Sequence, residues 1–380
     1  MKRVFCLIFG LILMISICVD NHTVCAEELQ IAPNCKSAVL IDAVSGEVLL
    51  SQDADKKLPV ASIVKLMTLK ITFDKIDKGE LSLSDELVAS EYACSMGGSQ
   101  LFLDPNTKHK LSDLLKSVIV ASANDSSVVL AESICGSENV FVREMNTTAS
   151  VLGLSNTLYT DCTGLREDQY SSALDVAKLS SVVFNHPIYK QYAKIWCEEY
   201  IHPSGRVTEI ANTNKLIRTL EGCEGGKTGT TDNAGYCLSI LTKRNDMSLI
   251  AVVLGADSTK NRFEDNKNLI NFGFVNFENH NVLSTDTSIG VLENNKVKPE
   301  NVELYPSNDF GIVARKGKTM SYEVQTIIYD IDRDYKGGEE IGKAYIYNEN
   351  ELIGEVGLIA KEDVSLKSYK DYISDIIEEW

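Results

Sequence analysis

The stretch YCLSILTKRNDMSLIAVVL, residues 236–254, contains two apolar runs that a polar turn separates. Residues 236–242 and 248–254 have the length and the β-branched content of buried strands. The segment Arg244-Asn245-Asp246 between them is typical of a turn. This stretch therefore predicts two consecutive strands of a sheet.

Further strands are expected near the start of the chain. Residues 37–42 and 47–50 are apolar runs on either side of Val44-Ser45-Gly46, a pattern that favours a hairpin. Apolar residues at helical spacing occupy much of the intervening chain, in residues 61–75, 111–134, 140–152 and 172–183. Strands that flank a helical middle indicate an α+β domain in which helices cover an antiparallel sheet.

The last quarter of the chain has a different pattern. After about residue 277 it consists of short strand-like runs separated by Asn, Gly and Lys, among them residues 321–329, 342–347 and 352–356. These runs predict a small all-β domain. We therefore expect a first domain at residues 27–280, a small all-β domain at 281–365 and a short amphipathic tail at 366–380.

The N-terminus has the three parts of a secretory signal peptide. Lys2-Arg3 precedes an apolar run at residues 4–19, and Val24-Cys25-Ala26 offers a small-residue cleavage site. We expect residues 1–26 to be removed after Ala26. The alternative is an uncleaved anchor, but the apolar run is shorter than the roughly 20 residues of a spanning helix. The mature protein is then exported, either to the outer face of the cytoplasmic membrane or out of the cell.

Charge and cysteine content exclude several classes of function. The formal net charge is −17, so nucleic acid is not an expected partner, because phosphate binding needs a basic surface. No metal or other cofactor is expected, since the chain has no Cys-x-x-Cys pair and its five His residues are scattered. Seven cysteines follow residue 26, an odd number without short paired spacing, and we expect them to be mostly free.

Ser62-Ile63-Val64-Lys65 is the first of three candidate catalytic motifs. A serine hydroxyl needs a base within hydrogen-bond reach, and a lysine three residues later on a helix lies on the same face. Lys65 can act as that base only if its pKa is lowered, which burial beside a second cation such as Lys227 would do. Ser-x-x-Lys alone also occurs by chance on any helix.

Ser122-Ala123-Asn124 is the second motif, and it lies where an apolar helix would end in a polar turn. The Ser122 hydroxyl can relay a proton between Lys65 and a leaving amine, and the Asn124 amide can hold a substrate carbonyl. Taken by itself, the segment is equally well explained as helix capping.

Lys227-Thr228-Gly229 is the third motif, just before the strand at residues 236–242. A lysine and a hydroxyl on a strand edge can clamp a carboxylate, and a glycine lets a substrate backbone approach closely. A phosphate-binding loop is the competing interpretation. It fails because the Gly-x-x-x-x-Gly-Lys-[Ser/Thr] spacing and a following helix are absent.

The three motifs in this order resemble the serine-type D-alanyl-D-alanine carboxypeptidases, the low-molecular-mass penicillin-binding proteins. The likeness covers roughly residues 35 to 365. It implies a β-lactamase/transpeptidase-like domain with a helical subdomain, followed by the small all-β domain. Beyond the motifs it rests on Pro59-Val60-Ala61, Gly97-Gly98-Ser99, Met145-Asn146, Leu152-Gly153-Leu154, Tyr170-Ser171-Ser172, Asn212-Thr213-Asn214 and Asp232-Asn233-Ala234-Gly235-Tyr236.

The resemblance implies a reaction on peptidoglycan stem peptides that end in D-Ala-D-Ala. Ser62 would attack the penultimate D-Ala carbonyl and form an acyl-enzyme, and β-lactams would inhibit the enzyme by trapping Ser62. Backbone N–H groups of Ser62 and Thr230 would hold the oxyanion. Lys227 and Thr228 would bind the terminal carboxylate, helped by Arg262. A plain surface residue is the alternative for Arg262.

Other functions share part of this pattern. A serine β-lactamase would use the same three motifs, but the Glu-x-x-Leu-Asn type loop of its commonest class is absent between residues 152 and 172. A D,D-endopeptidase that cuts peptidoglycan cross-links is closer still and stays open. A catalytically dead wall-binding module is expected to have lost one of Ser62, Lys65 or Lys227, yet all three are present.

Two features depart from the family pattern. Thr163-Gly164-Leu165 stands where some members have His-Gly-Leu, so a role of that histidine does not carry over. The tail at residues 366–380 is shorter than the familial amphipathic anchor, which leaves membrane contact through the tail open.

Overall fold

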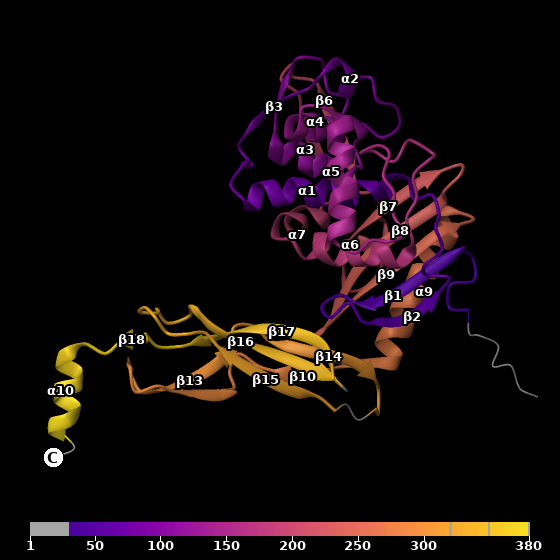
Figure 1. The fold of residues 1–380 in the computed structure, drawn as a ribbon. Helices are drawn as coiled ribbons and strands as arrows, with labels where there is room; N and C mark the ends of the chain where they lie inside the picture. Colours follow the sequence, from indigo (N-terminus) through magenta and orange to yellow (C-terminus); the bar gives the residue numbers. More distant parts are fainter. Residues whose placement is uncertain (1–29, 319–320, 349, 379–380) are drawn as a thin grey trace, which may run out of the picture. The chain divides into compact units, whose positions relative to one another are not determined.

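The computed structural model describes residues 30–318, 321–348 and 350–378. The predicted signal peptide, residues 1–26, lies outside these ranges. Within them the chain forms an α+β domain followed by a domain of strands (Figure 1).

A five-stranded antiparallel sheet forms the centre of the first domain, in the order β2-β1-β9-β8-β7. The predicted strand pair of residues 236–254 is the hairpin β8–β9, whose strands pair in register from Arg244↔Met247 to Leu238↔Val253. The sheet brings together the first and the last part of the domain's sequence, because β1 pairs with β9. Its strands are β1 (Ser37–Asp42), β2 (Val48–Gln52), β7 (Cys223–Thr231), β8 (Gly235–Arg244) and β9 (Met247–Ala256).

Both faces of the sheet are covered, which explains why its central strands are apolar without alternation. Every residue of β1 is buried, and alternate side chains belong to two separate cores. Val39 of β1 lies in the core that includes α6 (Ala173–Asn185), and Leu40 lies in the core that includes α9 (Thr259–Asn276). The sheet is thus a fixed platform between two helical layers.

A helical subdomain accompanies the sheet (Figure 1). The predicted helix at residues 111–134 is two helices, because Ser122 has a φ of +63° and Ala123 is extended, and these conformations interrupt helical hydrogen bonding. The helices of this part are α1 (Lys65–Asp77), α2 (Glu91–Cys94), α3 (Leu111–Val120), α4 (Asn124–Cys135), α5 (Glu138–Val151) and α7 (Pro187–Ala193), whereas the short α8 (Leu216–Thr219) belongs to the core that includes α9. Two short antiparallel strand pairs accompany these helices, β3 (Glu86–Val88) with β4 (Lys108–Lys110) and β5 (Cys197–Ile201) with β6 (Val207–Ala211).

The C-terminal domain is built from strands around its own apolar core. Its five-stranded sheet has the order β11-β13-β17-β16-β15, and β10 pairs with β14 and β12 with β18. The boundary predicted at residue 280 falls inside β10, which follows α9 without a loop. The strands are β10 (Phe277–Leu283), β11 (Gly290–Glu293), β12 (Val297–Lys298), β13 (Asn301–Pro306), β14 (Phe310–Arg315), β15 (Glu323–Ile328), β16 (Glu340–Asn348), β17 (Glu351–Ala360) and β18 (Ser365–Leu366).

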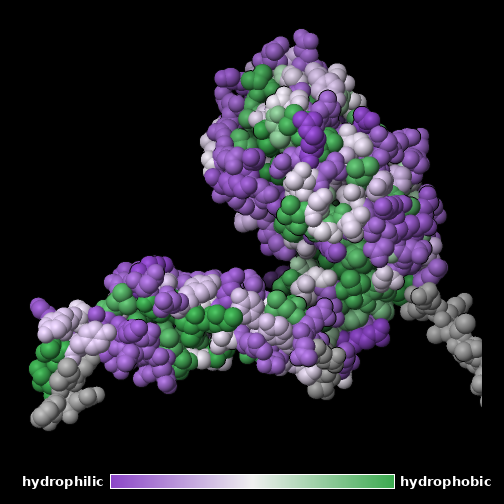
Figure 2. Space-filling model, in the orientation of Figure 1, coloured by the Kyte–Doolittle hydropathy of each residue, from purple (hydrophilic) through white to green (hydrophobic). Residues whose placement is uncertain are grey.

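The predicted tail contains α10 (Tyr369–Glu378), a short helix with an apolar side, while its first residue, Leu366, belongs to β18. Ile373 and Ile377 on this helix are exposed, and Figure 2 shows apolar surface in its region. Among the described residues, no helix has the length and apolar content needed to cross a membrane. All seven cysteines in the described ranges carry free thiols, as the sequence predicted.

Candidate active site

Ser62 and Lys65 meet because the segment before α1 is a 3₁₀ turn. The turn, Ala61–Val64, leads directly into α1 at Lys65. Side chains three residues apart eclipse one another in this geometry. The Lys65 Nζ therefore lies 2.9 Å from the Ser62 Oγ, as the Ser-x-x-Lys spacing predicted.

Lys65 is completely buried, and this changes its acid–base behaviour. Burial disfavours the charged ammonium and lowers the pKa of Lys65 to about 8, although Asp161 and Asp125 oppose the shift. The pKa of Lys227 is lowered well below its ordinary value, first by burial and then by repulsion from Lys65 and Arg262. Burial, more than a second cation, is therefore what lowers the pKa of Lys65.

The turn between α3 and α4 carries Ser122 to the third motif. The left-handed backbone of Ser122 ends one helix, and its hydroxyl accepts a hydrogen bond of 2.6 Å from the Lys227 Nζ. The same amine donates to the Thr228 carbonyl at 3.0 Å. Because Lys227 is the donor to its hydroxyl, Ser122 keeps its own proton available for another acceptor.

Asn124 opens α4 and is fixed by a neighbouring loop. Its backbone N–H donates to the Ser99 carbonyl at 2.7 Å, and its side-chain Nδ2 donates to the Gly97 carbonyl at 2.6 Å. Its Oδ1 is buried and has no hydrogen-bond partner in the described ranges. An unsatisfied buried acceptor is costly, so this atom suits a donor from a bound ligand.

Strand β7 brings the third motif against the turn that carries Ser62. A Cβ at Gly229 would lie 2.5 Å from the Val60 carbonyl oxygen and 3.2 Å from the Ile63 backbone nitrogen. The glycine therefore allows β7 to pack directly beside the turn that holds Ser62, a role that the sequence did not indicate. Thr228 Oγ1 donates to Thr213 Oγ1 at 2.8 Å, which fixes its rotamer.

Arg262 in α9 lies behind β7. Its side chain is buried, so the alternative of a plain surface residue is wrong. The Arg262 NH1 donates to Thr230 Oγ1 at 3.1 Å and to the Gly229 carbonyl at 3.3 Å, and the guanidinium lies near the rings of Tyr236 and Phe263. Arg262 thus adds positive charge at the strand that carries Lys227.

One part of the site was not found from the sequence. The Lys65 Nζ donates to the backbone carbonyl of Thr163 at 2.5 Å. Gly164 allows the loop to come close enough for this contact. Its φ is +88°, and a Cβ at this position would lie only 2.2 Å from the Ala61 carbonyl oxygen. The loop contacts Lys65 through its backbone, so a threonine in place of the familial histidine leaves the contact intact. In the sequence, only the glycine of Thr163-Gly164-Leu165 indicates that this loop can approach Lys65 closely.

Comparison with known protein families yields two matches. Residues 23–258 match the family model for D-alanyl-D-alanine carboxypeptidase. Residues 277–366 match the model for the C-terminal domain of penicillin-binding protein 5. Together the two matches include every predicted site residue except Arg262, which lies between them.

Individual relatives resemble the chain over most of its length. It is 34% identical over 355 residues to the Bacillus subtilis D-alanyl-D-alanine carboxypeptidase DacF, covering 92% of this chain and 91% of the relative. It is 31% identical over 362 residues to DacA of Haemophilus influenzae, with coverage of 92% and 91%.

Solved structures agree with these sequence matches. The structure of penicillin-binding protein 5 from H. influenzae superposes with a TM-score of 0.66 at 29% identity, covering 87% of this chain and 98% of that one. Penicillin-binding protein D2 from Listeria monocytogenes, in its ampicillin-bound form, has a TM-score of 0.56 at 30% identity, with coverage of 63% and 98%. The predicted fold class and enzyme class are confirmed. The chain belongs to the D-alanyl-D-alanine carboxypeptidase family, the low-molecular-mass serine penicillin-binding proteins.

Proposed function

We propose that the protein removes the terminal D-Ala from peptidoglycan stem pentapeptides through an acyl-enzyme on Ser62. The observation that carries this proposal is the buried Lys65 amine, 2.9 Å from the Ser62 hydroxyl, with its pKa lowered to about 8. A serine hydroxyl beside an amine that is partly neutral near neutral pH is an activated nucleophile.

The steps of the reaction follow from the contacts. The Ser62 Oγ attacks the penultimate D-Ala carbonyl carbon, and its proton moves to the Lys65 Nζ. The C–N bond then breaks, and the leaving amine takes this proton from the Lys65 Nζ by way of the Ser122 hydroxyl, which is free to donate. Water hydrolyses the ester and releases the shortened peptide. Backbone N–H groups of Ser62 and Thr230 hold the oxyanion in both steps.

Substrate binding is assigned to the β7 edge and to α4. Lys227, Thr228 and Arg262 supply the positive charge and hydroxyl that a terminal carboxylate requires. The free Oδ1 of Asn124 accepts an N–H from the peptide backbone of the substrate. A β-lactam presents the same carbonyl and carboxylate pair, so it acylates Ser62 and inhibits the enzyme.

The decisive experiment measures D-Ala release from a stem pentapeptide and, in parallel, cleavage of a cross-linked dimer. We expect faster D-Ala release. Preferential cleavage of the dimer would instead favour an endopeptidase, the name carried by a Pseudomonas aeruginosa relative that is 31% identical over 233 residues. Rapid hydrolysis of bound penicillin would favour a β-lactamase.

The cell envelope is the proposed location. The relatives are carboxypeptidases named for D-alanyl-D-alanine, and such peptides occur in the wall outside the cytoplasmic membrane. Export through the predicted signal at residues 1–26 would deliver the enzyme there. The exposed Ile373 and Ile377 of α10 support contact of the tail with the membrane surface.

Gly164→Ala tests the loop contact behind Ser62. A methyl group would overlap the Ala61 carbonyl oxygen, and the left-handed backbone at this position disfavours any L side chain. We expect a loss of stability of about 2 kcal/mol and slower acylation by a fluorescent penicillin, both measured on the purified protein. Gly46→Ala is the control, because Gly46 also has a positive φ but no atom lies within 4 Å of the position of an added Cβ. Equal acylation rates for both variants would refute the steric argument.

A further inference from the structure

We propose that Asp161 is a positioning residue for Lys65. Its carboxylate folds residues 161–166 into the turn that holds the Thr163 carbonyl oxygen against the Lys65 amine. This inference rests on the proposed role of Lys65 as the base, and it assigns a function to a residue outside the three motifs.

The Asp161 carboxylate is buried and accepts four hydrogen bonds from its own loop. Its Oδ1 accepts from the backbone N–H of Thr163 at 2.8 Å, from that of Gly164 at 2.5 Å and from Gln169 Nε2 at 3.0 Å. Its Oδ2 accepts from the backbone N–H of Arg166 at 2.7 Å. One side chain therefore binds three backbone N–H groups of the turn, those of Thr163, Gly164 and Arg166. Thr163 and Gly164 are the two residues joined by the peptide bond that contains the Thr163 carbonyl.

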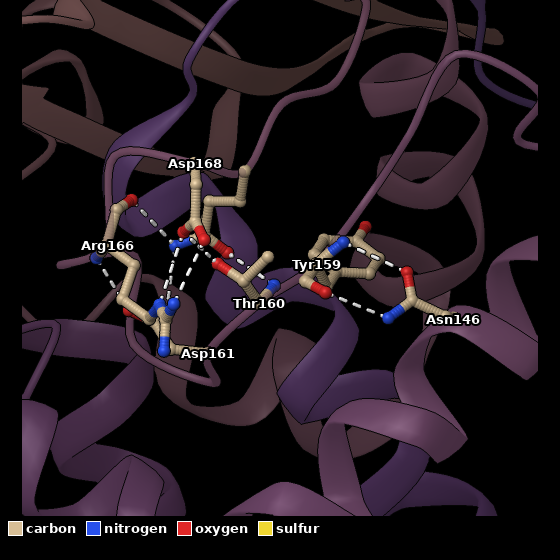
Figure 3. Close-up of polar contacts among 7 residues, drawn as sticks. Asn146, Tyr159, Thr160, Asp161, Arg166 and Asp168 are labelled. Atoms are coloured by element: carbon tan, nitrogen blue, oxygen red, sulfur yellow. Dashed lines mark hydrogen bonds and ion pairs between the residues drawn. The ribbon is translucent and has the colours of Figure 1, made fainter.

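The start of the loop is anchored independently of Asp161. The Asn146 side chain of α5 donates to the Tyr159 carbonyl at 2.8 Å and accepts from the Tyr159 N–H at 3.0 Å (Figure 3). The Cys162 N–H donates to Glu138 Oε1 at 3.1 Å. These contacts fix the backbone at Tyr159 and Cys162. The turn from Thr163 onward is instead held by Asp161.

The turn matters for chemistry because Thr163 contacts the reacting pair. Its carbonyl oxygen accepts from the Lys65 Nζ at 2.5 Å and lies 3.5 Å from the Ser62 Oγ. When Lys65 is neutral, an N–H directed at this carbonyl turns the nitrogen lone pair toward Ser62. A displaced carbonyl would leave the amine free to rotate away from the hydroxyl.

The charge of Asp161 acts on the same amine. The groups that face Lys65 are Cys162 and Asp161 on the loop and Asp125 on α4, which raise its pKa, and the repelling Lys227 on β7. Asp161 is therefore one of two carboxylates that hold Lys65 closer to its protonated form. Removing this charge while keeping the turn should favour the neutral amine at lower pH.

Three variants separate the geometric effect from the charge. Asp161→Ala removes all four acceptor contacts. Asp161→Asn removes the negative charge but keeps an amide oxygen that can accept the three hydrogen bonds of Oδ1, from Thr163, Gly164 and Gln169. Asp168→Asn is the matched control: it lies on the same loop but is exposed, and its carboxylate binds Arg166 and Thr160.

The readout is the rate of acylation by a fluorescent penicillin between pH 5.5 and 9.5, with thermal unfolding of each variant. We expect Asp161→Ala to be slower by about 10²-fold, the usual cost of a misplaced catalytic group. For Asp161→Asn we expect the acid limb to move to lower pH, so that its rate relative to the wild type is higher at pH 6 than at pH 9. Asp168→Asn should match the wild type.

A merely structural role of Asp161 would lower the melting temperature of Asp161→Asn and leave the shape of its pH profile unchanged, and that result would overturn the proposal. If Asp161→Ala does not fold, the Asp161→Asn profile still decides. Failure of the proposed function is recognised separately, because the wild-type protein would then not be labelled at all.

Discussion

Replacing Ser62 by alanine is expected to abolish covalent labelling by a fluorescent penicillin and to reduce D-Ala release on the order of 10⁶-fold. The Ser62 hydroxyl lies 2.9 Å from the buried Lys65 amine, and an alanine offers no atom to acylate. Labelling is read from a denaturing gel and mass spectrometry of the intact protein.

The control for this variant is Ser204→Ala, which removes an exposed hydroxyl from the turn between β5 and β6. It should be labelled at the wild-type rate. An adduct of unchanged mass on the Ser62→Ala protein would show that the nucleophile is another residue, and the proposed mechanism would be abandoned.

Lys65→Met should lower the acylation rate by about 10⁴-fold, because methionine fills the buried space but takes no proton. In the wild type the rate should rise with pH up to about pH 8, where the Lys65 amine becomes neutral. The residual rate of the variant should lack this rise. Measuring acylation from pH 6 to 9 tests both statements, and a variant that keeps the wild-type profile would exclude Lys65 as the base.

The same substitution has a consequence for stability. The pKa of Lys65 is about 8 in the folded protein and 10.5 as its ordinary value, so the unfolded chain binds the proton more tightly. Burial of the ammonium therefore costs stability below pH 8, and the cost disappears as the pH rises through 10.5. Between pH 7 and pH 10, the free energy of unfolding of the wild type should gain about 2 kcal/mol relative to Lys65→Met. Urea unfolding of both proteins at the two pH values measures this difference.

Much of the fold was predictable because its signals are local. The strands β8 and β9 are continuous apolar runs around a polar turn, and both faces of their sheet are covered by helices. The helix break at Ser122 was harder to predict, since the apolar pattern of residues 111–134 continues through it. A left-handed serine is a strained conformation that only the surrounding contacts maintain.

The sequence by itself predicted the candidate reacting groups: the Ser-x-x-Lys spacing favours Ser62 and Lys65 on one face of a helix, and the order of the three motifs indicates the family. The tertiary structure alone decided how these groups are tuned. Burial sets the pKa of Lys65, Gly229 brings β7 beside Val60, and Asp161 directs the Thr163 carbonyl to an amine 98 residues earlier in the chain. These effects arise from desolvation and from backbone atoms, and neither leaves a pattern in the local order of side chains.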